Sequence, residues 1–119
     1  MFGFSHTGSD ICGFGQDSSE HLCRRWTQLG AFYPFSRNHN ALDQTDQDPG
    51  VFSDEFSKMA ASVIGGRYRL LPYLYTLLVE SHTIGNPVVS PLFFNFFDDE
   101  NCRDVDEQFI SVVVRCCTI

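Results

Sequence analysis

The sequence predicts an α/β fold, in which short strands alternate with helices. Residues 1–14 combine alternating Phe residues with glycines, a pattern typical of a short buried strand that runs into a loop. Two stretches with apolar residues at helical spacing follow, at 20–33 and 53–85. A second strand-and-loop region, 35–49, separates them. This order of elements is that of successive β/α units.

The first helix has a recognisable start and end. Asp17 to Glu20 is typical of a capping box, and Pro34 closes the helix. Four apolar residues at helical spacing predict its buried face: Leu22, Trp26, Leu29 and Tyr33.

The second helix is long and apolar. Ser53 can cap it, and the acidic residues 54–55 suit its positive N-terminal end. Glycines 65–66 weaken its middle, and we expect Pro72 to kink or break it because proline lacks the N–H that an α-helix needs. Gly85 predicts its end.

The C-terminal third returns to strand-like sequence. Residues 87–97 favour a strand that Pro91 interrupts. From Ser111 the chain is a β-prone tail containing the pair Cys116–Cys117. We expect this tail to form an exposed edge strand, which is an aggregation liability.

Composition excludes several classes of function. The chain has 119 residues, 43% of them hydrophobic, and a net charge of −7, which argues against nucleic acid as a partner. No segment approaches the roughly 20 apolar residues that span a bilayer, and no signal peptide is visible. The five cysteines have no zinc-site spacing, and we expect neither a metal nor another cofactor. No nucleophile-elbow motif for a catalytic serine is present.

Five separated motifs carry a specific resemblance to one family. They are Gly8–Phe14 (GSDICGF), Leu22–Phe35 (LCRRWTQLGAFYPF), Arg37–Asn40 (RNHN), Arg67–Leu77 (RYRLLPYLYTL) and Pro87–Phe94 (PVVSPLFF). In this order they resemble the retaining α-glucosidases of glycoside hydrolase family 31, over Phe2 to Phe109.

The resemblance implies an incomplete (β/α)8 TIM barrel, made of its last strands and helices. Residues 1–97 would be the C-terminal portion of the catalytic barrel, and 98–119 the junction to a C-terminal β-sandwich. A complete barrel needs about 250 residues. Three departures stand out: Ser9 replaces an Ala, Ser90 replaces an Arg, and the tail from about residue 111 is atypical.

The resemblance also implies a reaction, the hydrolysis of terminal α-linked glucose with retention. Retaining glycosidases use two carboxyl groups about 5–5.5 Å apart. In this family both belong to earlier barrel segments, so no catalytic residue is assigned here. The implied substrate is an α-glucoside or malto-oligosaccharide, and the implied location of the parent enzyme is the secretory pathway, either lysosomal, vacuolar or extracellular.

Three residues are expected to bind substrate. His39 matches a family histidine that donates to a sugar hydroxyl, Phe14 an aromatic wall residue, and Asp10 a carboxylate that supports the pocket. The alternative without a binding role is a structural loop residue for His39, a core residue for Phe14, and a carboxylate that holds the turn for Asp10.

Cys12 and Cys23 match a disulfide of the family, with two buried thiols as the alternative. Two rival functions stay open: a non-catalytic truncated gene product, and a sugar-binding remnant without activity. In each case we expect the isolated chain to be inactive and marginally stable.

Overall fold

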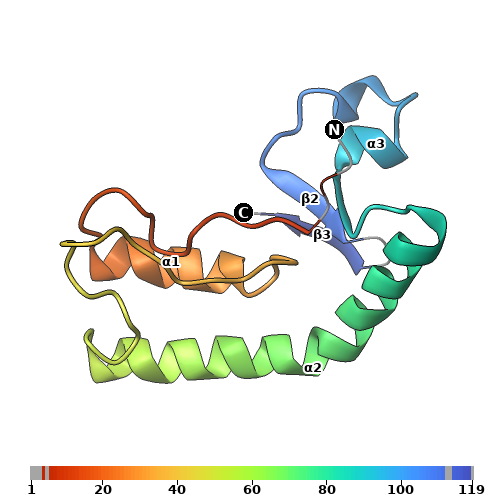
Figure 1. Cartoon of the computed structure of the whole chain (residues 1–119). Coiled ribbons are helices and arrows are strands. Elements are labelled where there is room, and N and C mark those ends of the chain that lie inside the picture. Colours follow the sequence, from red (N-terminus) through yellow and green to blue (C-terminus); the bar gives the residue numbers. More distant parts are fainter. Residues whose placement is uncertain (1–3, 5, 112–113, 119) are drawn as a thin grey trace. The chain divides into compact units, whose positions relative to one another are not determined.

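The computed structural model describes residues 4, 6–111 and 114–118. Two compact units divide the chain, one covering Thr7–Leu71 and the other built mainly from Pro72 onward. The elements follow one another along the chain as α1 (Glu20–Gly30), α2 (Asp54–Ile84), β1 (Val89–Pro91), α3 (Leu92–Asn95), a 3₁₀ turn (Glu100–Cys102), β2 (Gln108–Ser111) and β3 (Val114–Thr118) (Figure 1).

Helix α1 begins where the sequence predicts but with a different cap. Ser19 is the N-cap, and its hydroxyl accepts the backbone N–H of Leu22 at 3.3 Å. The predicted capping box is therefore wrong, because Asp17 instead accepts the backbone N–H of Thr45 at 2.8 Å. The helix also ends earlier than expected, at Gly30, and residues 31–35 continue as turns.

Helix α2 starts at the predicted cap and is longer than the proline suggested. The Ser53 hydroxyl accepts the backbone N–H of Phe56 at 3.1 Å. The helix runs through Pro72, so of the predicted kink or break the break is wrong, and the kink stays a prediction. The boundary between the two units falls at this residue. Gly85 follows the last turn with φ 78° and donates its N–H to Ser81, which confirms the predicted stop.

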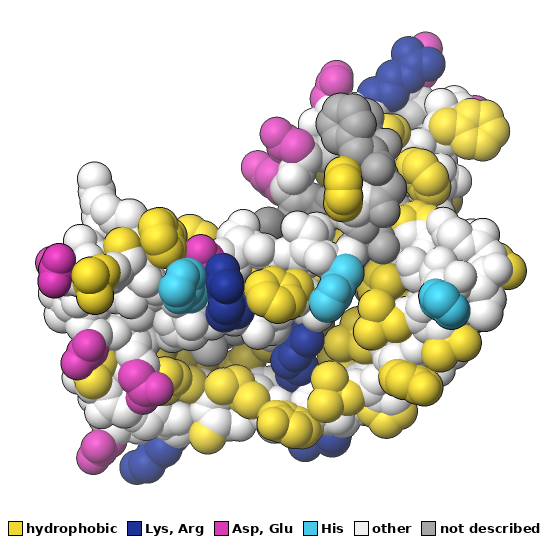
Figure 2. Space-filling view, in the orientation of Figure 1, with side chains coloured by type: hydrophobic (Ala, Val, Ile, Leu, Met, Phe, Trp, Pro, Cys, Tyr) yellow, Lys and Arg dark blue, Asp and Glu magenta, His cyan; other side chains and the backbone are white. Residues whose placement is uncertain are grey.

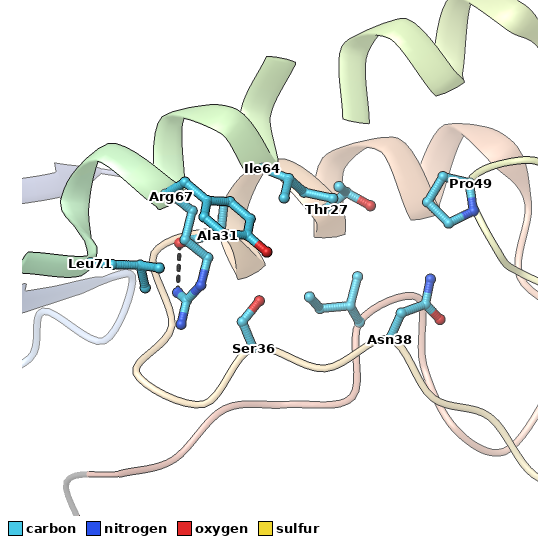
Figure 3. A pocket seen from close by; sticks show the side chains of 10 residues that line it. Thr27, Ala31, Ser36, Asn38, Pro49, Ile64, Arg67 and Leu71 are labelled. Carbon is cyan, nitrogen blue, oxygen red and sulfur yellow. Dashed lines mark hydrogen bonds between the residues drawn. The ribbon is translucent and has the colours of Figure 1, made fainter. Parts of the chain in front are cut away.

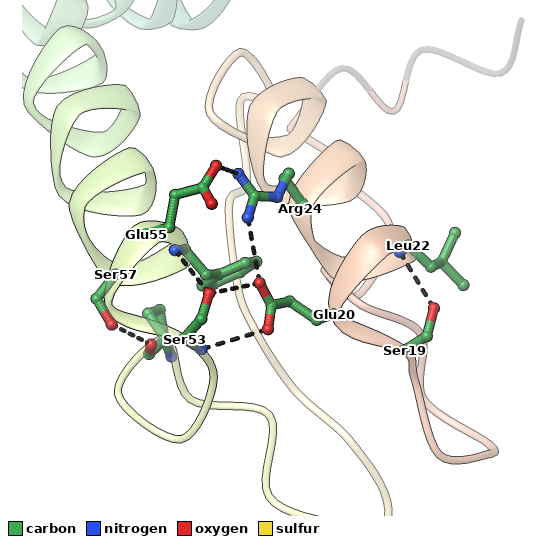
Figure 4. Close-up of polar contacts among 9 residues, drawn as sticks. Ser19, Glu20, Leu22, Arg24, Ser53, Glu55 and Ser57 are labelled. Carbon is green, nitrogen blue, oxygen red and sulfur yellow. Dashed lines mark hydrogen bonds and ion pairs between the residues drawn. The ribbon is translucent and has the colours of Figure 1, made fainter.

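The starts of α1 and α2 are joined by a cluster of polar side chains (Figure 4). The Glu20 carboxylate accepts the Ser53 hydroxyl at 2.6 Å and the Ser53 N–H at 3.3 Å. Arg24 lies between two carboxylates, donating to Glu20 and to Glu55 at 3.1 Å each. The Ser53 bond is the largest cause that holds the pKa of Glu20 below its usual range.

Arg67 joins the far end of α1 to α2. Its guanidinium donates to the carbonyls of Ala31 at 2.8 Å, Tyr33, and Pro34 at 3.1 Å, and burial lowers its pKa. These carbonyls follow the end of α1, where the helix dipole favours a cation. The start of α2 thus contacts the start of α1, and Arg67, further along α2, contacts the residues that follow the end of α1. The helix α1 and the first part of α2 therefore run in the same direction, as successive helices of β/α units do (Figure 1).

The two strands predicted in 1–14 and 35–49 are reduced to a single parallel bridge. Ile11 pairs with Asn38, and the Ile11 N–H donates to Arg37 at 2.8 Å. Parallel strands are normally buried within larger sheets. Among residues 6–53 these two segments have only each other as partners, so the ladder does not extend.

The second unit holds an antiparallel sheet of three strands within the described residues, in the order β1-β2-β3. Val89 pairs with Ser111, and Phe109 pairs with Cys117. Pro91 ends β1, so the predicted interruption is confirmed, but the strand expected after it is wrong because Leu92–Asn95 form helix α3. The β-prone tail forms β3, which lies at an edge of this sheet; Val112, Val113 and Ile119 lie outside the described residues.

The core of the first unit lies where the 11–12 segment meets both helices. Ile11, Cys12, Cys23, Phe56 and Ala60 form one buried cluster. Gly30 allows this approach: a Cβ at Gly30 would lie 2.5 Å from Ile11 Cδ1. The segment and α1 are therefore in contact at the distance that only glycine permits.

Much apolar surface stays exposed on this unit, and Figure 2 shows one face of the chain with hydrophobic side chains over α2. Ile64 and Leu71 are each 40% exposed and Tyr68 is 68% exposed. Within the part of the chain that the structure describes, no helix is both long and apolar enough to cross a membrane.

We predict that Gly30→Ala destabilises the chain by about 1–3 kcal/mol, because the new methyl group displaces Ile11 from a packed core. Gly65→Ala is the matched control, since its Cβ would meet no atom within 4 Å. The control should stabilise α2 by up to about 1 kcal/mol. Urea unfolding followed by circular dichroism measures both, and equal effects of the two substitutions would contradict the packing described.

We also predict that Ser53→Ala flattens the dependence of stability on acidic pH. A carboxyl whose pKa is depressed by folding stabilises the native state above its unfolded pKa, and this stability is lost as the pH falls through the lower folded value. For Glu20 the loss begins below about pH 4.3. Ser57→Ala is the control, because that hydroxyl donates to Pro49 instead. Thermal midpoints measured from pH 3 to 7 give the comparison; parallel curves for wild type and Ser53→Ala would count against it.

Candidate functional site

The loop that carries Asp10 and Phe14 is a tight turn anchored on α1. The N–H of Gly13 donates to the backbone carbonyl of Asp10 at 2.9 Å, and Cys12 and Gly13 have φ values of 75° and 90°. A left-handed non-glycine residue costs about 1–3 kcal/mol and persists only where the surroundings hold it. A disulfide joins Cys12 to Cys23 of α1, with the Cα atoms 4.4 Å apart, as predicted.

The segment 36–41 lies against this turn. Besides the bond from Ile11 to Arg37, the N–H of Ala41 donates to Phe14 at 2.9 Å. These two backbone contacts hold the stretch that contains His39 beside the turn that contains Phe14. The side chain of Asn40 donates to the Thr45 carbonyl at 2.9 Å and braces the same segment.

Asp10 is paired with Arg37. Both Nε and Nη2 of the guanidinium donate to one carboxylate oxygen, at 3.1 and 2.7 Å. The Arg37 side chain is 49% exposed, and pairs near the surface contribute about 0.2–1 kcal/mol. The pair is therefore a weak link between the two loops, and it fixes the direction in which the Asp10 carboxylate points.

Phe14 and His39 are in contact. Their ring centroids are 5.2 Å apart and the rings are tilted by 38°. Phe14 is 49% exposed, so it is not the core phenylalanine that the twelve phenylalanines of the sequence made plausible. The pair offers an apolar ring face next to a group that both donates and accepts hydrogen bonds.

His39 also lines a cavity of about 320 Å³. The other lining residues are Asn38, Asn40, Asp46, Gln47, Asp48 and Val51. Amide, imidazole and carboxylate groups dominate this lining, and they suit a ligand rich in hydroxyl groups. Among the described residues no group of three or more metal-binding side chains occurs.

A second cavity, of about 400 Å³, lies between α1, α2 and the 36–38 segment (Figure 3). Its lining includes Ile11, Ala31, Ile64 and Leu71, with Arg67 turned toward carbonyls at the end of α1. Ile11 and Asn38, the two residues of the parallel bridge, both line it, and His39 does not. We therefore assign the candidate site to the cavity at His39.

The sequence did not reveal two residues that support the site. Gln47 is a buried polar residue, 5% exposed, in a stretch that shows no periodicity. Asp17 accepts the Thr45 N–H, and this bond is the main reason why its pKa lies below the usual range. A polar residue in an irregular segment gives no sequence signal that separates a buried partner from a solvated one.

Comparisons with known proteins agree with these features. Residues 1–77 match the profile of the glycosyl hydrolases family 31 TIM-barrel domain. Intestinal sucrase-isomaltase of Oryctolagus cuniculus is 53% identical over 110 residues, which are 92% of this chain and 6% of that protein. Lysosomal alpha-glucosidase of Mus musculus is 48% identical over 110 residues, again 92% of this chain and 12% of that protein.

A solved structure shows the same arrangement. The Tris-bound glucosidase II alpha subunit superposes with a TM-score of 0.86 at 33% identity, over 92% of this chain and 12% of that one. The chain thus spans about 6% and 12% of the length of the two curated relatives named above.

We predict that removing the bridge with Cys12→Ala and Cys23→Ala lowers the free energy of unfolding by about 2–3 kcal/mol, because the short loop is no longer closed in the unfolded state. Cys102→Ala is the control, since Cys102 is not bridged. Equilibrium unfolding of the two variants gives the test. Equal stability of the double variant and the wild-type chain would contradict a structural role for the bridge.

Proposed function

Because the chain belongs to glycosyl hydrolase family 31, we propose that it forms one wall of the α-glucoside pocket of a retaining α-glucosidase. The observation that carries the proposal is the contact of Phe14 with His39, a residue that also lines a polar cavity. An aromatic ring packs against the C–H face of a sugar, and the adjacent imidazole exchanges hydrogen bonds with its hydroxyl groups.

Each site residue has a role in this proposal. His39 donates to a hydroxyl of the glucose unit, Phe14 forms the apolar side of the pocket, and Asp10 orients the loop through Arg37. The Cys12–Cys23 bridge supports the turn from behind. None of these residues takes part in bond cleavage.

We place the nucleophile and the acid/base outside this stretch of sequence. A retaining mechanism needs two carboxyl groups about 5–5.5 Å apart, one of them a free nucleophile. The Asp10 carboxylate already accepts two hydrogen bonds from Arg37, which suits a positioning role better than attack on a sugar. In this proposal residues 1–97 belong to the catalytic barrel, and 98–119 lead to a C-terminal β region.

The relatives suggest a location. Their names include a lysosomal and an intestinal enzyme, and an endoplasmic reticulum glucosidase is among the similar structures. We propose the secretory pathway for the enzyme to which this segment belongs, in agreement with the disulfide.

A second candidate function is sugar binding without catalysis. The polar cavity at His39 favours it, since a wall that contacts a sugar needs no nucleophile to do so. The two candidates share the same contacts and differ in turnover, so one experiment addresses both.

We predict that the 119-residue chain binds maltose weakly, with a dissociation constant in the millimolar range, and that His39→Ala abolishes the binding. The reason is that one wall supplies only a few of the contacts that a complete pocket offers. Titration followed by the NMR signals of the histidine imidazoles measures it.

His21→Ala is the matched control, because His21 is an exposed residue of α1 away from the cavity. Unchanged binding by His39→Ala would contradict the proposed role. Hydrolysis of a chromogenic α-glucoside by the pure chain would contradict the placement of both catalytic carboxyl groups elsewhere.

A further inference from the structure

Gln47 is a buried amide in a segment without helix or strand. Its Nε2 donates to Asn38 Oδ1 at 3.0 Å and to the Ile11 carbonyl at 3.1 Å, with a longer contact of 3.4 Å to the Gly13 carbonyl. Its own backbone carbonyl accepts Asn38 Nδ2 at 2.9 Å. Gln47 is only 5% exposed, and burying an amide costs free energy unless it is hydrogen-bonded. These bonds therefore offset the cost of burying its side chain.

Two of the three acceptors of Gln47 Nε2 belong to residues that immediately precede the two side chains of the site. Gly13 precedes Phe14, and Asn38 precedes His39. We propose that Gln47 is a positioning residue that sets the separation of the Phe14 and His39 rings. The proposal rests on the function proposed above only for its consequence on sugar binding; the positioning itself concerns the two rings.

The two loops are also joined by other contacts, among them one from Asn38 Nδ2 to Cys12 Sγ at 3.8 Å. The backbone bonds Ile11 to Arg37 and Ala41 to Phe14 fix the outer ends of the paired segments. The Asp10–Arg37 pair is half exposed and weak. Gln47 lies between these points, where one amide group spans both loops and excludes solvent.

The chemistry of the amide explains why other side chains fail at this position. Nε2 carries two hydrogens that face three acceptors, two carbonyls and an amide oxygen. Leucine has a similar volume but no donor, so these acceptors would lose their partner. An ionised glutamate would add a fourth acceptor with a negative charge, whereas a protonated glutamate would restore one donor.

The test compares Gln47→Leu with Gln44→Leu in the full 119-residue chain. Gln44 is in the same segment. The hydrogen bond that it makes with another described residue runs from its backbone N–H to the Ala41 carbonyl, and the substitution keeps this bond. The readout is the chemical shift of the His39 ring protons, which depends on the distance to Phe14, with Phe14→Leu as the reference for a lost contact. Maltose titration is recorded on each variant.

We expect Gln47→Leu to move the His39 signals toward those of Phe14→Leu, to leave His21 and His82 in place, and to weaken maltose binding by about tenfold. Gln44→Leu should match the wild-type chain. Unmoved His39 signals in folded Gln47→Leu overturn the proposal, as do His39 signals at their unfolded position in the wild-type chain. If the wild-type chain binds no maltose but the His39 signals move, the sugar-binding function fails and the positioning role stands.

Gln47→Glu covers the case in which Gln47→Leu does not fold. At about pH 3.5 its carboxyl is mostly protonated and donates, and at about pH 5.5 it is ionised. Between these values the His39 signals should move further in Gln47→Glu than in the wild-type chain, which carries the same other carboxyl groups, among them Asp46 and Asp48 of the cavity. Equal movement in the two chains would overturn the proposal.

Discussion

The bridge between Cys12 and Cys23 is the constraint on which the rest of the first unit depends. Cys12 has a left-handed backbone, an unfavourable conformation for any residue with a side chain. The bridge holds this turn on α1 at Cys23, while Ile11 packs against Gly30, about two turns further along the helix. Since Asp10 and Phe14 lie two residues either side of Cys12, the covalent link holds their backbone on α1, where the strand ladder is a single bridge.

The position of α1 is in turn set by polar contacts at both of its ends. Glu20 and Arg24 connect its start to the start of α2, and Arg67 of α2 binds the carbonyls that follow its end. The apolar cluster around Phe56 lies between these contacts. Glu20 accepts a backbone N–H at the start of α2, and Arg67 donates to backbone carbonyls after the end of α1. These contacts also fix the direction of one helix relative to the other.

Sequence reasoning succeeded where a local rule decides the outcome. Ser53, Gly85 and Pro91 each act on the backbone of their own segment, and the structure confirms the predicted cap, helix end and strand end. It failed where partners distant in sequence decide. Asp17 forms no capping box because Thr45, 28 residues away, takes its carboxylate. In the described part of the first predicted strand, the hydrophobic alternation gives a single bridge, from Ile11 to Asn38. Pro72 is accommodated within a continuous helix.

The candidate site divides in the same way. The resemblance supplied Asp10, Phe14 and His39, whose proximity no spacing rule gives, and it missed Gln47, which touches both loops without a motif of its own. Magnitudes then limit what these residues do together. A hydrogen bond adds about 0.5–1.5 kcal/mol and an aromatic contact a similar amount, whereas association costs at least about 4 kcal/mol. One wall therefore holds a sugar only weakly, and useful affinity for an α-glucoside requires further walls that contact the same sugar ring.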